Sequence, residues 1–121
     1  MSTDERGYSD ASTTLEEVRQ RLDAFNTARD WQQFHEPKDL AMCLAAEAGE
    51  LLEPFLWKRT GEELDREAIA QELADVLICA LNLSAKLEID LLDAVDRKIA
   101  LNSERYPVEK ARGSAAKHDR L

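Results

Sequence analysis

The sequence has little of what disulfide frameworks and turn-rich folds require. Its 121 residues include four glycines, three prolines and two cysteines, and aromatic side chains make up 6% of the chain. Two cysteines cannot build a disulfide framework, so a reducing compartment fits. Few glycines and prolines among many Ala, Leu, Glu, Lys and Arg favour helices, and no segment has the alternating pattern of a strand. We therefore expect a one-domain, all-α protein.

Positive charge is also scarce, since the net charge is −9. A protein that binds duplex DNA or RNA needs a basic surface, so no nucleic acid polymer is expected as a partner. A free nucleotide stays compatible, because metal ions can carry the attraction to its phosphates. Residues 1–14 lack the apolar stretch of a signal peptide, and no run approaches the roughly 20 apolar residues of a spanning helix. We expect no membrane partner and a cytoplasmic location.

Apolar residues recur at helical spacing in four segments, which predicts a four-helix bundle. Thr14 and Glu17 form a capping-box pattern ahead of the first helix, and Asp65 and Asp90 can cap the third and fourth. Pro54 predicts a kink or break near the end of the second helix, because proline lacks an N–H and clashes with the carbonyl four residues back. The expected helices span about 14–29, 38–57, 66–88 and 91–106.

The chain divides into three expected parts. Residues 1–12 are polar and aperiodic, which predicts a mobile tail; residues 13–108 form the helical domain, and residues 109–121 form a basic tail. The second and third helices are apolar on several sides. That is more than one small four-helix monomer can cover, so we expect an oligomer.

Two pairs of carboxylates interrupt the apolar stripes of the second and third helices. Glu47 and Glu50 are three residues apart, as are Glu72 and Asp75, so each pair shares one helix face. Apolar residues at helical spacing on either side of Glu47 and Glu72 indicate that these faces point toward the interior. Buried carboxylates either take up protons or meet cations. We interpret the four as a site for a hard divalent cation; for one such pair alone, a solvated helix face is the simpler interpretation.

Carboxylate-only ligands narrow the choice of metal to Mg²⁺, Mn²⁺ or Ca²⁺. Zinc favours Cys and His, and di-iron bundles use a Glu-x-x-His motif where this chain has Glu50 and Asp75 in the last position. Mg²⁺ is usually shared with substrate phosphates, which indicates a phosphate-bearing substrate. The metal would polarise a phosphoryl oxygen and activate an attacking water. Glu53, one turn past Glu50, is a candidate either for the base that activates this water or for a group that supports the metal ligands.

Polar and aromatic residues that could bind a nucleotide lie outside these pairs. Trp31 and Trp57 bracket the second helix and could stack on a base, and His35 could bond a substrate, although a lone histidine is more often structural. Three polar residues of the fourth helix share one face and could meet phosphates, with a solvated face as the simpler interpretation. These are Lys98, Asn102 and Arg105.

The order Glu47-x-x-Glu50, then Glu72-x-x-Asp75, resembles the signature of the MazG-like all-α nucleotide pyrophosphohydrolases. Further segments are similar to the dCTP pyrophosphatase branch of that family, and the resemblance covers roughly residues 15–117. These segments are Asp30–Pro37, Gly49–Leu51, Trp57-Lys58, Glu72–Ile78, Arg105–Pro107 and Arg112–Ser114, together with Lys98 and Asn102.

The resemblance implies Mg²⁺-dependent hydrolysis of a (deoxy)nucleoside triphosphate, such as dCTP or a modified pyrimidine, to the monophosphate and pyrophosphate. It also implies a house-cleaning role on the nucleotide pool and a homotetramer made of two dimers. Carried over to this sequence, it assigns Mg²⁺ to Glu47, Glu50, Glu72 and Asp75, the nucleoside to Trp31, His35 and Trp57, and the phosphates to Lys98, Asn102 and Arg105.

Two positions depart from the branch. Cys79 stands where the branch carries a Tyr in the nucleotide pocket, and Pro54 stands where it has an ordinary helix former. Cys79 lies one turn beyond Asp75, so we expect it to face the substrate, and base preference stays open. Two other classes of protein stay open as well: a non-catalytic helical module that binds nucleotide or a protein partner, and a purely structural oligomer with solvent-exposed carboxylates.

Overall fold

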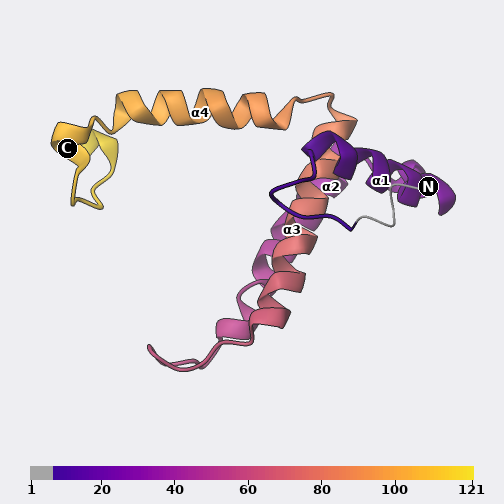
Figure 1. The fold of residues 1–121 in the computed structure, drawn as a ribbon, viewed down its shortest axis with the longest axis horizontal. Coiled ribbons are helices and arrows are strands. Elements are labelled where there is room, and N and C mark those ends of the chain that lie inside the picture. Colours follow the sequence, from indigo (N-terminus) through magenta and orange to yellow (C-terminus); the bar gives the residue numbers. More distant parts are fainter. Residues whose placement is uncertain (1–6) are drawn as a thin grey trace. The chain divides into compact units, whose positions relative to one another are not determined.

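The computed structural model describes residues 7–121, where all regular secondary structure is helical and no strand occurs (Figure 1). The all-α fold class is therefore confirmed. All four expected helices are present, and a short fifth one, α5, follows them. The α-helices are α1 (Leu15–Ala28), α2 (Pro37–Glu50), α3 (Arg66–Lys86), α4 (Leu91–Arg105) and α5 (Val108–Ala111), and the 3-10 helices are η2 (Gln32–Phe34), η3 (Glu53–Phe55) and η4 (His118–Arg120).

Three helices begin at the caps that the sequence predicts. The hydroxyl of Thr14 accepts a hydrogen bond from the Glu17 N–H at 3.1 Å, and the Glu17 carboxylate accepts one from the Thr14 N–H at 3.3 Å, which completes the capping box of α1. Asp65 and Asp90 each accept a hydrogen bond at 3.1 Å from the main-chain N–H three residues on. The starts of α1, α3 and α4 are thus set by local chemistry.

The second helix is shorter than the expected span of 38–57. α2 begins at Pro37, ends at Glu50 and gives way to the separate turn η3, which contains Pro54. Proline has no N–H to continue the helical ladder, and its ring would clash with the Glu50 carbonyl. The predicted break beside the acidic pair is confirmed, while the predicted end of the helix at residue 57 is wrong.

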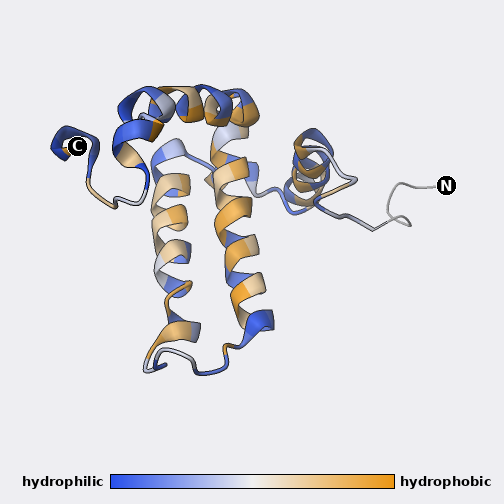
Figure 2. Ribbon diagram, turned by 60° about the vertical axis from the view of Figure 1, so that its left-hand side comes forward, coloured by the Kyte–Doolittle hydropathy of each residue, from blue (hydrophilic) through white to orange (hydrophobic). Residues whose placement is uncertain are grey.

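The helices α2 and α3 lie side by side and antiparallel, joined by the loop 51–65, and α1 packs more lightly against α3 (Figure 2). Within the described residues, only Leu40 of α2 and Leu81 of α3 are buried apolar side chains. Many large apolar side chains stay exposed, among them Leu73 and Leu77 on α3. This hairpin is therefore the scaffold of the first compact unit, which ends at Glu88.

By length and composition alone, α3 would be long and apolar enough to cross a membrane, and it is the one such helix among the described residues. The expectation that no apolar run approaches the length of a membrane-spanning helix is therefore wrong for α3. Glu72 and Asp75 interrupt its apolar run but leave it apolar enough to meet that criterion. Because α3 packs along α2, helix packing accounts for part of its apolar surface.

The second compact unit runs from Ile89 to Leu121 and holds α4, α5 and η4. The Tyr106 ring meets the His118 ring edge to face, with centroids 5.8 Å apart, so the last residues fold back on the end of α4. The sequence did not predict α5 or η4, since no periodic apolar pattern marks them. The division into tail, helical domain and basic tail stays a prediction, and residues 1–6 of the expected mobile tail lie outside the described residues.

Candidate functional site

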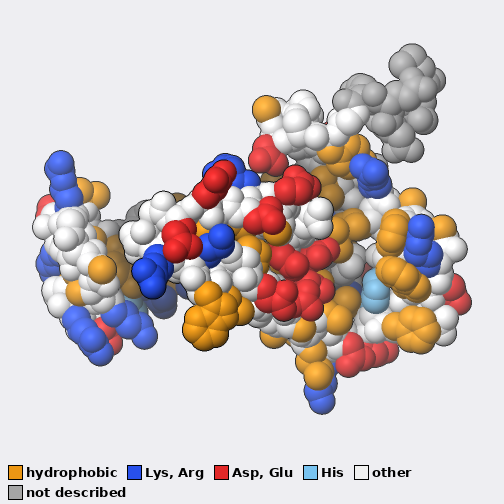
Figure 3. All heavy atoms as spheres, turned by 90° about the horizontal axis from the view of Figure 1, so that it is seen from below, with side chains coloured by type: hydrophobic (Ala, Val, Ile, Leu, Met, Phe, Trp, Pro, Cys, Tyr) orange, Lys and Arg blue, Asp and Glu red, His pale blue; other side chains and the backbone are white. Residues whose placement is uncertain are grey.

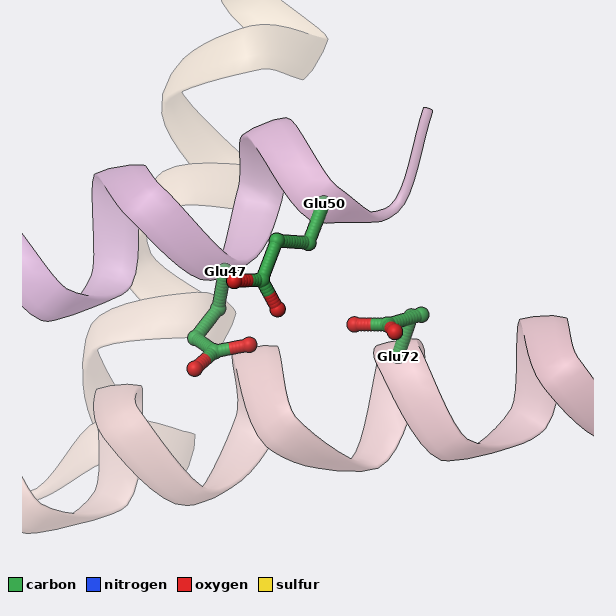
Figure 4. A group of neighbouring side chains, drawn as sticks. All are labelled: Glu47, Glu50 and Glu72. Carbon is green, nitrogen blue, oxygen red and sulfur yellow. The ribbon is translucent and has the colours of Figure 1, made fainter. Parts of the chain in front are cut away.

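Three carboxylates from two helices converge at one end of the α2–α3 hairpin. Glu47 and Glu50 come from the last turn of α2 and Glu72 comes from α3, and the three point toward one another (Figure 4). One oxygen of each lies within 4.8 Å of one oxygen of each of the others. Acidic side chains also gather in the middle of the face shown in Figure 3. The predicted spacing of three residues therefore brings carboxylates together across two helices.

Two of these carboxylates carry an oxygen that is cut off from water. The Oε2 atoms of Glu47 and Glu72 are buried and have no hydrogen-bond partner in the described part of the chain. A buried carboxylate oxygen without a partner is costly, and a cation is a common way to satisfy it. Oxygen donors at this spacing fit a hard divalent cation such as Mg²⁺. This acidic cluster is the candidate metal site.

Two members of the acidic cluster, Glu47 and Glu72, hold their protons more tightly than free glutamate does. Burial is the main cause that raises the pKa of Glu47, followed by the hydrogen bond that its protonated form donates to Glu50 and by the charges of Glu50, Asp75 and Glu72. Burial also raises the pKa of Glu72, with further contributions from the charges of Glu50, Asp75 and Glu53. Asp75 is thus close enough to act on both groups, although it lies outside the trio that meets within 4.8 Å. A bound cation would relieve this repulsion.

A cavity of about 610 Å³ lies at the other end of the hairpin, walled by α1, η2, α2 and α3. Trp31, His35 and Cys79, three of the predicted substrate residues, line it. The Trp31 ring packs edge to face on Phe25, with centroids 5.5 Å apart, which fixes one wall. Burial, then the neighbouring Cys43, raises the pKa of the Cys79 thiol, so this thiol is uncharged at neutral pH. A flat, apolar group fits this cavity better than a charged one.

Comparison with known proteins agrees with this geometry. The family model described as the MazG-like family matches residues 43–121, which include all four predicted metal ligands. The chain belongs to the MazG-like family. It is 43% identical to dCTP pyrophosphatase 1 of Rattus norvegicus and 42% identical to that of Homo sapiens, in each case over 115 residues, 89% of this chain and 68% of the relative.

A solved structure with the same fold extends the MazG-like assignment to three dimensions. A crystal structure of a pyrophosphatase from Archaeoglobus fulgidus superimposes with a TM-score of 0.70 at 34% sequence identity. The match covers 84% of this chain and 99% of that one. The resemblance that the motifs indicated is therefore confirmed for the family and for the fold.

Four further predicted site residues of this MazG-like chain are exposed: one follows η3, and three lie on α4. Trp57 follows η3 with a positive φ of 65° and a side chain that is 96% exposed, and it does not line the cavity. Three polar residues of α4 are exposed and belong to the second compact unit, so their roles stay predictions. These are Lys98, Asn102 and Arg105.

The motif comparison missed two asparagines that line the cavity. Asn26 of α1 and Asn82 of α3 are joined by a hydrogen bond of 3.1 Å between their side-chain amides. A signal was present, because Asn82 follows Cys79 by three residues and Asp75 by seven, which places all three on one face of the helix. Asn82 thus interrupts an apolar stripe as the carboxylates do.

Proposed function

We propose that this MazG-like protein hydrolyses a (deoxy)nucleoside triphosphate, such as dCTP or a modified pyrimidine nucleotide, to the monophosphate and pyrophosphate with the help of Mg²⁺. That it is a nucleoside triphosphate pyrophosphatase follows from its family and from relatives named dCTP pyrophosphatase 1. One observation carries the metal-dependent part. Carboxylates of α2 and α3 meet within 4.8 Å, and two of their buried oxygens lack a partner in the described residues.

Four carboxylates would hold the metal in this proposal: Glu47, Glu50, Glu72 and Asp75. Their oxygens suit Mg²⁺, and Mn²⁺ could replace it. When bound, the cation would neutralise triphosphate charge and polarise the phosphoryl group that reacts. Among the chain's own groups, Glu53 is the candidate that takes the proton from the attacking water, because its charge is close enough to act on Glu72.

The cavity would hold the nucleoside. Trp31 offers a ring for stacking on the base, and His35 lies on the same cavity wall with two nitrogens for hydrogen bonding. Trp57 is a further candidate for nucleoside contact from the exposed turn after η3. We assign the phosphates to Lys98, Asn102 and Arg105, either of the same chain or of a neighbouring subunit.

We further propose a homotetramer built as a dimer of dimers. The support is the apolar surface that a single chain leaves in contact with water. Leu92, Val95 and Ile99 recur at spacings of three and four along α4, and all three are exposed. Replacing Leu92 and Ile99 by Asp should reduce the molar mass that light scattering measures. A cytoplasmic location completes the proposal and agrees with two free cysteines.

The products of the reaction test the proposed function. We would incubate the protein and Mg²⁺ with each deoxynucleoside triphosphate and identify products by ³¹P NMR. The expected products are a deoxynucleoside monophosphate and pyrophosphate. Release of single phosphates, or no turnover with any nucleotide, would contradict the proposal.

A non-catalytic module of the same fold is the second candidate, and it would bind nucleotide without turnover. The converging carboxylates weigh against it, because a binding module has no need of the complete acidic set. A purely structural oligomer would require solvent-exposed carboxylates, whereas the Oε2 atoms of Glu47 and Glu72 are buried.

A further inference from the structure

Two facing amides form part of the cavity wall between α1 and α3. The Asn26 Nδ2 atom donates a hydrogen bond to the Asn82 Oδ1 atom at 3.1 Å. Asn26 is only 6% exposed, and Asn82 is half-buried. Both line the cavity that also contains Trp31. A buried amide has to satisfy its donors and acceptors, so what the remaining amide atoms meet matters for any ligand in the cavity.

Each side-chain amide uses one of its two polar atoms in this hydrogen bond, and its second polar atom has no partner among the described residues. Among residues 7–121, the Asn26 Oδ1 and the Asn82 Nδ2 make no hydrogen bond, which leaves one acceptor and one donor of the pair available. Rotating both amides together by half a turn keeps a bond between them but exchanges the available donor and acceptor. No further side-chain hydrogen bond in the described residues fixes either orientation. The amide pair is therefore reversible.

The position of the amide pair matches the base of a nucleotide whose phosphates lie at the acidic cluster. Asn82 follows Asp75 by seven residues on the same face of α3, which corresponds to about 10 Å along the helix. Trp31 and the neutral thiol of Cys79 supply apolar walls beside the pair. A base could thus stack in the cavity and present its hydrogen-bonding edge to the two amides.

We propose that Asn26 and Asn82 read the edge of the substrate's base and that their reversibility lets the enzyme accept both 4-amino and 4-oxo pyrimidines. Cytosine places its N4 donor beside the N3 acceptor, whereas uracil and thymine place the O4 acceptor beside the N3 donor. The pair meets either order by turning both amides. This inference rests on the proposed function, and it predicts a broader pyrimidine range than the name of the relatives suggests.

Turnover provides the first arm of the test. We expect the kcat/KM values for dCTP and dUTP to agree within about ten-fold, because each arrangement makes the same number of hydrogen bonds. A larger ratio would overturn the inference. If neither nucleotide yields pyrophosphate, the proposed function fails, and the second arm still decides the role of the amide pair.

The second arm measures binding without turnover, by calorimetry with dCMP, dUMP and deoxyribose 5-phosphate. Asn82→Leu, similar in shape but without an amide, should weaken both nucleotides by roughly ten-fold and leave the base-free sugar phosphate unchanged. The double variant Asn26→Leu with Asn82→Leu leaves no unpaired amide and should show the same pattern if the single variant misfolds. Equal weakening of all three ligands, or no binding of either nucleotide to the natural protein, would overturn the inference.

Discussion

The two ends of the α2–α3 hairpin satisfy their polar groups in opposite ways. At the acidic end, carboxylates crowd within 4.8 Å, and two of their oxygens lack a partner in the described residues. At the cavity end, two neutral amides, those of Asn26 and Asn82, bond to each other at 3.1 Å. The acidic end therefore needs a cation for its electrostatic balance, whereas each of the two amides already has one hydrogen-bond partner in the other.

The separation follows from the spacing of residues along two antiparallel helices. Moving one turn from the carboxylates toward the cavity reaches Cys43 on α2 and Cys79 on α3, and both cysteines line the cavity. Burial raises the pKa of the Cys79 thiol, so an uncharged group lies on α3 between Asp75 and Asn82. A ligand that is anionic at one end and flat and hydrogen-bonding at the other fits both ends, as a nucleotide does.

Removing a carboxylate of the acidic end should have the largest effect on turnover, because it removes a ligand of the proposed metal. Glu47→Gln or Asp75→Asn should lower kcat for nucleotide hydrolysis by about a thousand-fold or more, because metal-ion catalysis supplies several kcal/mol. Circular dichroism should show unchanged helical content. Glu67→Gln is the matched control, an exposed residue in the first turn of α3 that should keep its activity. Unfolding of the site variants would instead assign the carboxylates a structural role.

The sequence predicts the acidic end better than the cavity end, and the reason is physical. A carboxylate inside an apolar stripe is costly wherever it lies, so periodicity alone identifies Glu47 and Glu72. Asparagine is much less costly to bury, so Asn82 in the same kind of stripe does not predict a site. Its hydrogen-bond partner, Asn26, lies 56 residues away in the sequence and is known only from the structure. The break at Pro54 is also local and predictable, whereas the exposure of Trp57 depends on how the chain continues after it.

Removing the stacking ring should have the next largest effect, and it acts on the cavity end. Trp31→Ala should raise KM by about ten-fold or more with little change in kcat, because stacking on a base contributes roughly 1–3 kcal/mol. Trp31→Phe keeps a ring and should restore most of the affinity. Steady-state kinetics with dCTP would measure both. A fall in kcat at constant KM would show that the two ends are not divided as described.

Glu53 lies close enough to the acidic cluster for its charge to act on Glu72, but it is not one of the three converging carboxylates. We therefore expect its removal to reduce turnover less than removal of Glu47 or Asp75. Glu53→Gln should lower kcat by roughly ten- to a hundred-fold, the range for loss of a general base, and leave metal affinity nearly unchanged. Metal titrations of activity would separate the two parameters. A change in metal affinity with unchanged kcat would make Glu53 a ligand instead of a base.

The smallest expected effect concerns pH and the stability of the metal-free protein. The raised pKa values of Glu47 and Glu72 mean that the folded state binds protons more tightly than the unfolded state, whose carboxyls titrate near 4.5. Their contribution to stability is present below that value and is lost as pH rises through the raised values. Thermal unfolding without metal should therefore shift to higher temperature on mild acidification from neutral pH.

A double variant and the addition of Mg²⁺ distinguish the titration of Glu47 and Glu72 from the titration of other groups. The double variant Glu47→Gln with Glu72→Gln should lose that part of the pH dependence, since neither position titrates. Adding Mg²⁺ at neutral pH should stabilise the natural protein but not this variant. If Mg²⁺ stabilises both equally, the cation binds elsewhere.

The most direct test of the division between the two ends is a crystal structure with Mg²⁺ and a dCTP analogue whose α,β-bridging oxygen is replaced by NH. The expected result is metal density among Glu47, Glu50, Glu72 and Asp75, with the base beside Trp31 and its edge on Asn26 and Asn82. Metal density away from these carboxylates, or a base outside the cavity between α1 and α3, would contradict the account.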